Sequence, residues 1–408
     1  MNAGYREALS WLYGTQRFGI KLGLDNVRRL LRELELPGKN QRFIHVAGTN
    51  GKGSVCAMID SICRAEGYRT GLFTSPHLVS YRERIRVDGE MIEEQEVAEG
   101  LNAIRQRIAD WDPHPTFFEI TTALGLDHFT KRDCELVVLE TGLGGRLDAT
   151  NAITPIASVI TPIGYDHQAW LGNTLEEIAG EKAGVIKPQI PVVSAKQEPA
   201  AEKVIRARAA ECEAPLEFVT GSYSASPLSL AGTHQKENAA LALGALRSTE
   251  IAIDQPAIVQ GLANVEWPAR FQRWDERTII DGAHNPAGAH VLAETWRQEF
   301  GDDRATIILA VLRDKDVAGI LGALAPIAQC IILPSVRTAR ALPPKDVAQI
   351  ISAITPRLQH SITASLPSAL DVARAAPDRI LVTGSLHFAG EALATLSGDP
   401  AALEDCAQ

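Results

Sequence analysis

The stretch FIHVAGTNGKGSVCAMIDSICRAEG, residues 43–67, predicts a strand, a glycine-rich turn and a helix in immediate succession. Its first residues are mostly apolar, which is typical of a strand buried on both faces. Val55, Ile59 and Ile62 then recur at the spacing of one helix face, and Gly67 marks the end of that helix. Another apolar run, GLFTS, begins at residue 71. Together these segments predict a βαβ unit, the repeating element of a parallel sheet.

Apolar runs continue to alternate with helical patterns along most of the chain. The capping-box pattern Thr174-x-x-Glu177 predicts the start of one helix. A second series begins near residue 278, where Asn285 and Pro286 have the residue types of a helix N-cap and first helical position. The other expected strands cover residues 135–140, 155–161, 191–195, 305–312, 330–334 and 379–385.

This alternation predicts an α/β fold, and 408 residues are enough for two domains. We place a larger domain with a parallel-rich sheet at residues 1–272 and a smaller α/β domain at 273–408. The stretch from Ser222 to Gly232 is rich in Ser, Pro and Gly, and we expect it to form a loop within the first domain.

Composition and charge exclude several classes of protein. Charged residues make up 22% and hydrophobic residues 45%, which argues against a disordered chain or a fibrous repeat. The net charge of −10 provides no basic surface for nucleic acid. No apolar run approaches the roughly 18 residues of a membrane span, and the six scattered cysteines contain no C-x-x-C pair. We therefore expect a soluble, cytoplasmic protein without nucleic acid or membrane partners. We also expect a monomer.

The turn Gly48–Ser54, GTNGKGS, predicts a nucleotide site. Glycines let backbone N–H groups surround phosphate oxygens, the helix N-terminus adds positive potential, and Lys52 supplies a point charge. The turn departs from the general G-x-x-x-x-G-K-[ST] pattern, because Val46 replaces the first glycine and Gly53 separates the lysine from Ser54. The alternative is a glycine-rich turn that binds nothing.

Magnesium bound with nucleotide needs hard oxygen ligands, and two carboxylates are candidates. Glu119 lies at the start of an apolar helix and Glu140 lies at the end of a strand. The sequence pattern alone does not favour either carboxylate as the metal ligand. Each could equally face solvent at the end of its element. His167 follows Asp166 after a strand, and Lys182 lies in the segment GEKAGVIK. Without further evidence, His167 would be a structural histidine and Lys182 would be a solvent-facing lysine.

Seven motifs, taken in order, resemble the folylpolyglutamate synthase family, including its bifunctional dihydrofolate synthase members. The family belongs to the Mur ligase superfamily. The resemblance spans about residues 17–390 and implies a P-loop mononucleotide-binding ATPase domain followed by a Rossmann-like domain. It also implies ATP and two Mg²⁺ ions as cofactors, and ligation of L-glutamate to a pteroate or folate carboxylate through an acyl phosphate. The motifs are GTNGKGS, FTSPHLVSYRERIRVDG, LETGLGGRLDATN, DHQAWLG, EKAG, DGAHNP and DKD.

The resemblance also implies individual roles. Ser75 would bind the first metal, Glu119 would bind both metals, and His167 would bind the second. Glu140 would lie next to these ligands without contacting a metal. Lys182 would act as a carbamate and a further metal ligand. The expected catalytic residues are Lys52, Lys182 and His284. The expected nucleotide contacts are Gly48, Thr49, Asn50, Gly51, Lys52, Gly53, Ser54, Asn238, Arg270 and Asp281. The expected substrate contacts are Ser75, Pro76, His77, Arg82 and Ser385.

Two segments would line the folate site, the loop 73–89 and the segment 18–24; without the resemblance they would be a surface loop and a helix lead-in. Two other functions remain open. A peptidoglycan-precursor Mur ligase would share the chemistry, but the 73–89 loop and the EKAG motif argue against it. A non-catalytic P-loop switch protein would need neither His167 nor Lys182, nor a second α/β domain.

Overall fold

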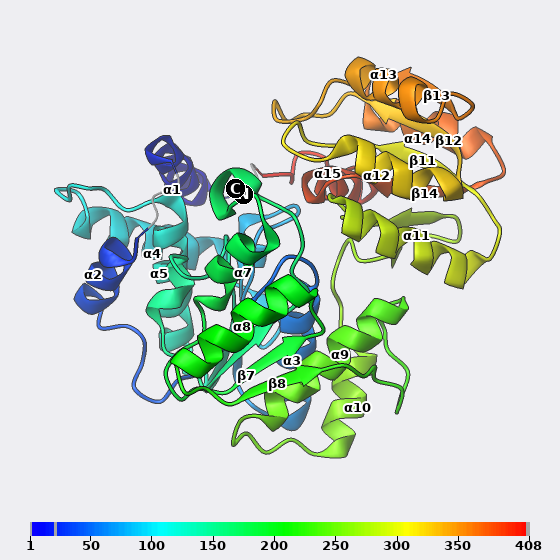
Figure 1. Cartoon of the computed structure of the whole chain (residues 1–408). Coiled ribbons are helices and arrows are strands. Elements are labelled where there is room, and N and C mark those ends of the chain that lie inside the picture. The colour runs from blue at the N-terminus through cyan, green and yellow to red at the C-terminus, as the bar shows by residue number, and fades with distance from the viewer. Residues whose placement is uncertain (1, 20–22, 405–408) are drawn as a thin grey trace.

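The computed structural model of the chain describes residues 2–19 and 23–404 and contains two β-sheets (Figure 1). The first sheet has the strand order β4-β3-β2-β5-β1-β6-β7-β8. Its strands pair in parallel except at one edge, where β3 and β4 run antiparallel. The strands are β1 Arg42–Ala47, β2 Thr70–Phe73, β3 Ile85–Val87, β4 Glu90–Met91, β5 Leu136–Glu140, β6 Ala157–Ile160, β7 Val192–Ala195 and β8 Leu216–Val219.

Helices cover both faces of this sheet, so its central strands are buried on both sides. In β5, Val137 packs in the same cluster as residues of α1, α4 and α5, whereas Val138 packs with α3, α9 and α10. The helices are α1 Ala3–Gly14, α2 Asp25–Glu33, α3 Lys52–Glu66, α4 Glu94–Arg107, α5 Phe117–Lys131, α6 Gln168–Leu171, α7 Leu175–Ala183, α8 Pro199–Glu211, α9 Thr233–Arg247 and α10 Gln255–Ala263, with short 3₁₀ turns at Thr15–Phe18, Tyr81–Arg84 and Ala149–Ala152.

The second sheet has the order β13-β12-β11-β14-β10-β9 and is parallel apart from β9. α11, α12 and α13 cover one face, and α14 and α15 cover the other. The strands are β9 Gln272–Arg273, β10 Thr278–Ile280, β11 Ala305–Leu309, β12 Ala328–Pro334, β13 Gln359–Thr363 and β14 Arg379–Thr383. The helices are α11 Pro286–Phe300, α12 Val317–Leu324, α13 Pro344–Ile354, α14 Leu366–Ala375 and α15 Leu386–Leu396, with a 3₁₀ turn at Ala325–Ile327.

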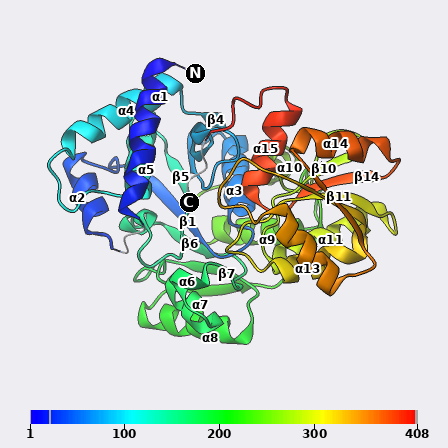
Figure 2. The same ribbon diagram turned by 90° about the horizontal axis from the view of Figure 1, so that it is seen from above.

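The second domain lies on one side of the first, away from α1, α2, α4 and α5 (Figures 1 and 2). The expected strands and the two expected helix starts, Thr174 and Asn285, are confirmed. β13 was not expected, because its sequence QHSIT is largely polar and lies at an exposed sheet edge. The expected domain boundary at 272/273 falls inside β9, and Ala269 already packs in the core of the second domain.

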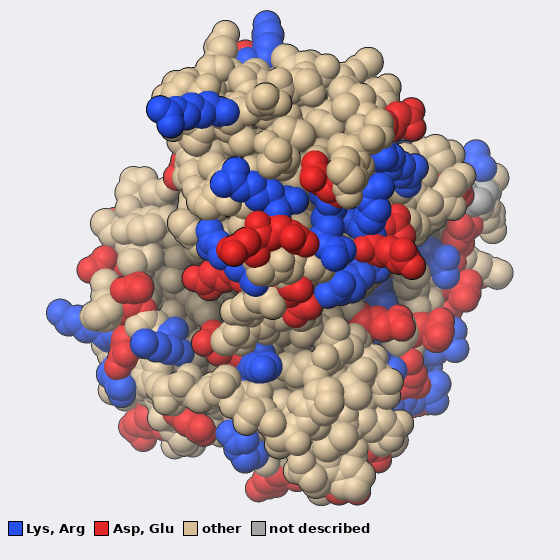
Figure 3. All heavy atoms as spheres, turned by 90° about the vertical axis from the view of Figure 1, so that its right-hand side faces the viewer, with Lys and Arg blue, Asp and Glu red and all other residues tan. Residues whose placement is uncertain are grey.

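Two surface properties bear on partners. On the face in Figure 3, positive and negative side chains are intermixed, and no large area of one sign is present. Among the helices in the described part of the chain, none is long and apolar enough to cross a membrane.

Candidate active site

A cavity of about 610 Å³ lies between the two domains, at the carboxyl ends of strands in the first sheet. β1 lies between β5 and β6, and open α/β sheets bind ligands where neighbouring connections diverge in this way. The volume is within the range of small-molecule sites. The expected site residues that line it are Gly48, Thr49, Asn50, Gly51, Lys52, Gly53, Ser54, Ser75, Pro76, His167, Lys182, Asn238, Arg270, Asp281 and His284.

The turn 48–54 has the geometry of an anion site. Gly51 precedes α3 in the left-handed conformation at φ 87°, so the first N–H groups of a 15-residue helix face the cavity. A Cβ on Gly48 would lie 1.9 Å from Oγ1 of Thr161, which excludes any side chain there. The ammonium group of Lys52 donates to the carbonyl of Thr49 at 3.3 Å and lies at the cavity wall.

Glu140 lines the cavity, and Glu119 does not. Oε2 of Glu140 accepts a hydrogen bond of 3.1 Å from the backbone N–H of Ser75. Burial raises the pKa of Glu140, and the positive charge of Lys52 opposes this shift. The hydroxyl oxygen of Ser75 is buried and has no hydrogen-bond partner among the described residues. An orphaned hydroxyl beside a buried carboxylate is a donor set suited to a hard cation.

Glu119 is directed to the start of its own helix. Its Oε2 accepts from the backbone N–H and the hydroxyl of Thr116, at 2.7 and 2.9 Å, and completes the capping box of α5. The alternative for this residue was a solvent-facing carboxylate at the start of its helix, but Glu119 is buried and caps the helix instead. The geometry of the cavity therefore favours Glu140 over Glu119, and the expected role of Glu119 as the shared metal ligand stays a prediction.

Lys182 is buried on α7, and its ammonium nitrogen donates to the carbonyl of Gly48 at 2.7 Å. Burial and the positive charge of Lys52 lower the pKa of Lys182 to about 7. This arrangement excludes the interpretation as a solvent-facing lysine. A large share of its amine is neutral at physiological pH, which a reaction with CO₂ requires.

His167 is the N-cap residue that precedes α6, and it has the left-handed conformation, at φ 51°. Burial lowers the pKa of His167 to about 4, and nearby lysines add to this shift. The imidazole is therefore neutral at pH 7, the form that binds metal ions. The described residues contain no group of three or more His, Cys, Asp or Glu side chains suited to a metal ion. A metal here would need other donors, such as Ser75, the modified Lys182 or a substrate phosphate.

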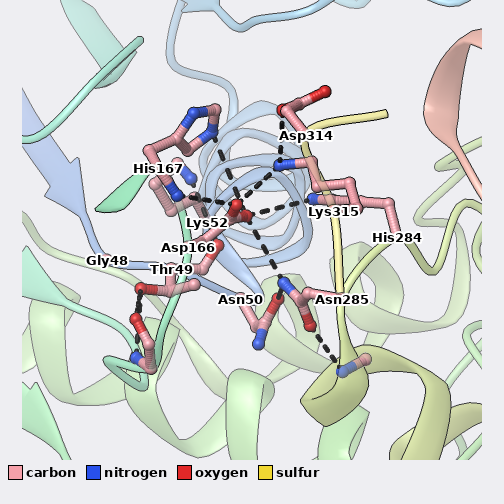
Figure 4. Close-up of polar contacts among 12 residues, drawn as sticks. Gly48, Thr49, Asn50, Lys52, Asp166, His167, His284, Asn285, Asp314 and Lys315 are labelled. Carbon is pink, nitrogen blue, oxygen red and sulfur yellow. Dashed lines mark hydrogen bonds and ion pairs between the residues drawn. The ribbon is translucent and has the colours of Figure 1, made fainter. Parts of the chain in front are cut away.

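Asp166 lies at the centre of contacts that join the two domains (Figure 4). Its Oδ1 is 2.6 Å from Nζ of Lys315, and its Oδ2 is 3.5 Å from both Nε2 of His284 and Nδ2 of Asn285. Burial alone would raise the pKa of Asp166, but the hydrogen bond from His284 and the neighbouring cationic groups hold it well below its usual value. Sequence reasoning missed Asp166 and Lys315, although both lie in quoted motifs.

The nucleotide-side residues from the two domains also meet at the cavity. Asn238 of α9 lies against Gly51, leaving no room there for a Cβ. The carboxylate of Asp281 accepts from the backbone N–H groups of Phe271 and Ala283, both at 2.8 Å. Burial raises the pKa of Asp281, and the guanidinium of Arg270 opposes that shift. Backbone groups before β9 and after β10 thus hold this carboxylate in place.

Three expected substrate residues do not line the cavity. The hydroxyl of Ser385 caps α15 by accepting from the N–H of Phe388 at 3.1 Å. Nδ1 of His77 accepts a hydrogen bond of 2.8 Å from Arg84, and Arg82 donates to the carbonyl of Ile92. These three therefore support neighbouring structure in this conformation. Within the segment 18–24, residues 20–22 lie outside the described residues.

Comparison with known proteins matches both domains. The Mur ligase middle domain matches residues 46–210, and the Mur ligase glutamate ligase domain matches residues 269–386. The dihydrofolate synthase/folylpolyglutamate synthase of Bacillus subtilis is 36% identical over 422 residues, covering 95% of this chain and 98% of its own.

Two solved structures share the whole fold. Folylpolyglutamate synthase from Mycobacterium tuberculosis, complexed with ADP and AMPPCP, has a TM-score of 0.88 at 33% identity and covers 98% of this chain and 99% of its own. The bifunctional folylpolyglutamate synthase/dihydrofolate synthase from Yersinia pestis, complexed with AMPPNP and a Mn ion, has a TM-score of 0.88 at 30% identity and covers 96% of this chain and 98% of its own.

Proposed function

The chain belongs to the folylpolyglutamate synthase/dihydrofolate synthase family, and we propose that it joins L-glutamate to a pteroate or folate carboxylate through an acyl phosphate. It is an ATP-dependent ligase that uses a divalent metal. The observation that carries the proposal is one cavity lined by a phosphate-binding turn from the first domain and by His284 from the glutamate ligase domain.

The proposed reaction has two steps. A carboxylate oxygen of the acceptor first attacks the γ-phosphorus of ATP, and the bond to the bridging oxygen breaks to release ADP. The amine of glutamate then attacks the acyl carbon, loses a proton and displaces phosphate. The N–H groups of the 48–54 turn and Lys52 bind the phosphates and oppose the negative charge that develops on the transferred group. The second domain covers the cavity, which protects the acyl phosphate from water.

Four residues fit the proposed metal sites. We propose that Ser75 and Glu140 hold one ion and that Glu140, His167 and Lys182 hold the other, with Lys182 as a carbamate. When bound, the metal supplies positive charge to the phosphate oxygens. The support is the orphaned Ser75 hydroxyl, the neutral His167 ring and the buried amine of Lys182. In carbamate formation the neutral amine bonds to the carbon of CO₂, and one proton is released.

We propose roles for the second domain on the same basis. His284 and Asp281 would act on the glutamate and nucleotide sides of the cavity, with Asn238 and Arg270 as further nucleotide contacts. We place the end of the first domain just before Ala269, because that residue packs with the second core. We also propose a cytoplasmic location, supported by the buried free thiols Cys56, Cys63, Cys134 and Cys212.

One assay tests the function. Phosphate release is measured with ATP and glutamate present, using dihydropteroate and tetrahydrofolate as separate acceptors and no acceptor as the control. We expect release that requires both glutamate and an acceptor. If neither acceptor supports release, the assay is repeated with a nucleotide-linked muropeptide, and release with that acceptor would support the peptidoglycan ligase instead. Phosphate release at the same rate with and without every acceptor would support a nucleotide-hydrolysing switch protein.

A further inference from the structure

The 73–89 loop belongs to the first domain in sequence but packs against the second domain. Leu78 is buried in the same cluster as Phe388 and Ala389 of α15. Gly390 follows on that helix, and a Cβ there would lie 1.9 Å from the carbonyl oxygen of Leu78. The loop backbone therefore lies directly on the backbone of α15, and only glycine permits this approach.

Glu404, in the segment after α15, binds the same loop. Its backbone N–H donates to the carbonyl of Val79 at 2.8 Å, and its carboxylate accepts from the N–H of Tyr81 at 2.5 Å and the hydroxyl of Ser80 at 3.4 Å. The same carboxylate accepts from the hydroxyl of Tyr5 on α1, at 3.0 and 3.1 Å. Glu404 thus joins the end of the second domain, the loop and the N-terminal helix.

Hydrogen bonds within the loop connect these contacts to its cavity end. The carboxylate of Glu83 accepts from the N–H groups of Leu78, Val79 and Ser80 at 2.8, 2.9 and 2.8 Å. Ser75 and Pro76, which line the cavity, lie only two or three residues before Leu78. A hydrogen bond to a carboxylate is stronger than one between two neutral groups. The hydrogen bond from the backbone N–H of Tyr81 to Glu404 therefore restricts the position of the whole loop.

We propose that Glu404 and Gly390 are positioning residues that fix the cavity end of the 73–89 loop, and with it Ser75, when the second domain is docked. This inference rests on the proposed function, because Ser75 gains its role from the metal and acceptor carboxylate beside it. The consequence is that the acceptor site becomes organised when the second domain docks against the first. The N–H groups and Lys52 of the 48–54 turn, which are the proposed main phosphate contacts, lie outside this loop, so we expect nucleotide affinity to change far less than acceptor affinity.

The test compares Glu404→Ala with Asp399→Asn, a control that removes an acidic group from the exposed part of the same segment. We expect Glu404→Ala to raise KM for the folate acceptor about five- to tenfold, the equivalent of about 1 kcal/mol, and to leave KM for ATP within about twofold. Hydrogen exchange at the amides of residues 77–84 should become faster, while Asp399→Asn changes neither quantity. Glu404→Gln, which keeps an acceptor oxygen, should restore part of the loss.

Gly390→Ala provides a second approach, because it forces the loop off α15 without touching the carboxylate. It should raise the acceptor KM and the exchange rate at residues 77–84 in the same way. An unchanged acceptor KM in both variants would overturn the inference, as would an equal loss for ATP and acceptor. Hydrogen exchange is measured without turnover. If the variants showed faster exchange but the wild-type protein ligated no folate, the proposed function would be rejected and the positioning role would stand.

Discussion

Nζ of Lys315 lies 2.6 Å from Oδ1 of Asp166, and these two side chains, each 8% exposed, connect the second domain to the first across the cavity. Asn285 adds a second connection, because its Nδ2 donates to Oδ1 of Asn50 in the 48–54 turn at 3.0 Å. Both contacts join residues that are far apart in the sequence and close to the expected phosphates. Polar contacts at the site itself therefore help to hold the two domains together.

Replacing Lys315 should loosen this arrangement. Lys315→Met leaves Asp166 buried beside His284 without its closest cation, and breaking a buried ion pair costs about 3–5 kcal/mol. We expect a larger radius of gyration by small-angle X-ray scattering and a fall in kcat/KM of more than about tenfold. Lys345→Met, at an exposed position of α13, is the control. Unchanged scattering and activity in Lys315→Met would contradict the role of this pair.

The two carboxylates can be separated by matched variants. Glu140→Gln keeps the side-chain shape but removes the charge at the cavity, so activity should fall at least about 100-fold and the Mg²⁺ concentration needed should rise. Glu119→Gln weakens a helix cap, so it should cost about 1 kcal/mol of stability and leave the Mg²⁺ requirement unchanged. Titration of activity with Mg²⁺ and thermal melting measure both effects. The reverse pattern would return the metal role to Glu119.

Lys182→Ala should be nearly inactive, because it removes the proposed anionic ligand. Added acetate should restore part of the activity by occupying the vacated space with a carboxylate. Wild-type protein supplied with ¹³C-labelled CO₂ should show a carbamate signal by NMR that Lys182→Ala lacks. Lys203→Ala, at an exposed position of α8, should keep both the signal and the activity. A labelled protein without that signal would contradict the carbamate.

His234 predicts part of the pH dependence of stability. Burial, with the positive charge of Arg270, lowers the pKa of His234 to about 4, whereas the unfolded value is about 6.5. Between these values the unfolded chain binds more protons, so stability rises with pH from about 4 to 6.5 and is lost as pH falls through this range. We expect the melting temperature to fall less steeply on acidification in His234→Gln. Equal slopes for both proteins would show that His234 does not contribute.

The sequence determined the features that depend on neighbouring residues. The glycines and Lys52 of the 48–54 turn, the helix starts at Thr174 and Asn285, and most of the central strands follow from local backbone preferences and from burial on both faces. The residues that determine each of these features lie within a few positions of one another, so a short stretch of sequence is enough to predict the feature.

Tertiary structure decided which side chains meet. The sequence did not distinguish Glu119 from Glu140. In the fold, β5 pairs Glu140 with Val46 near the end of β1, next to the 48–54 turn, whereas Glu119 caps its own helix. The partner of Asp166 lies 149 positions away, in the other domain. Sheet register and domain docking set these distances, and both result from packing over the whole chain rather than from any local stretch of it.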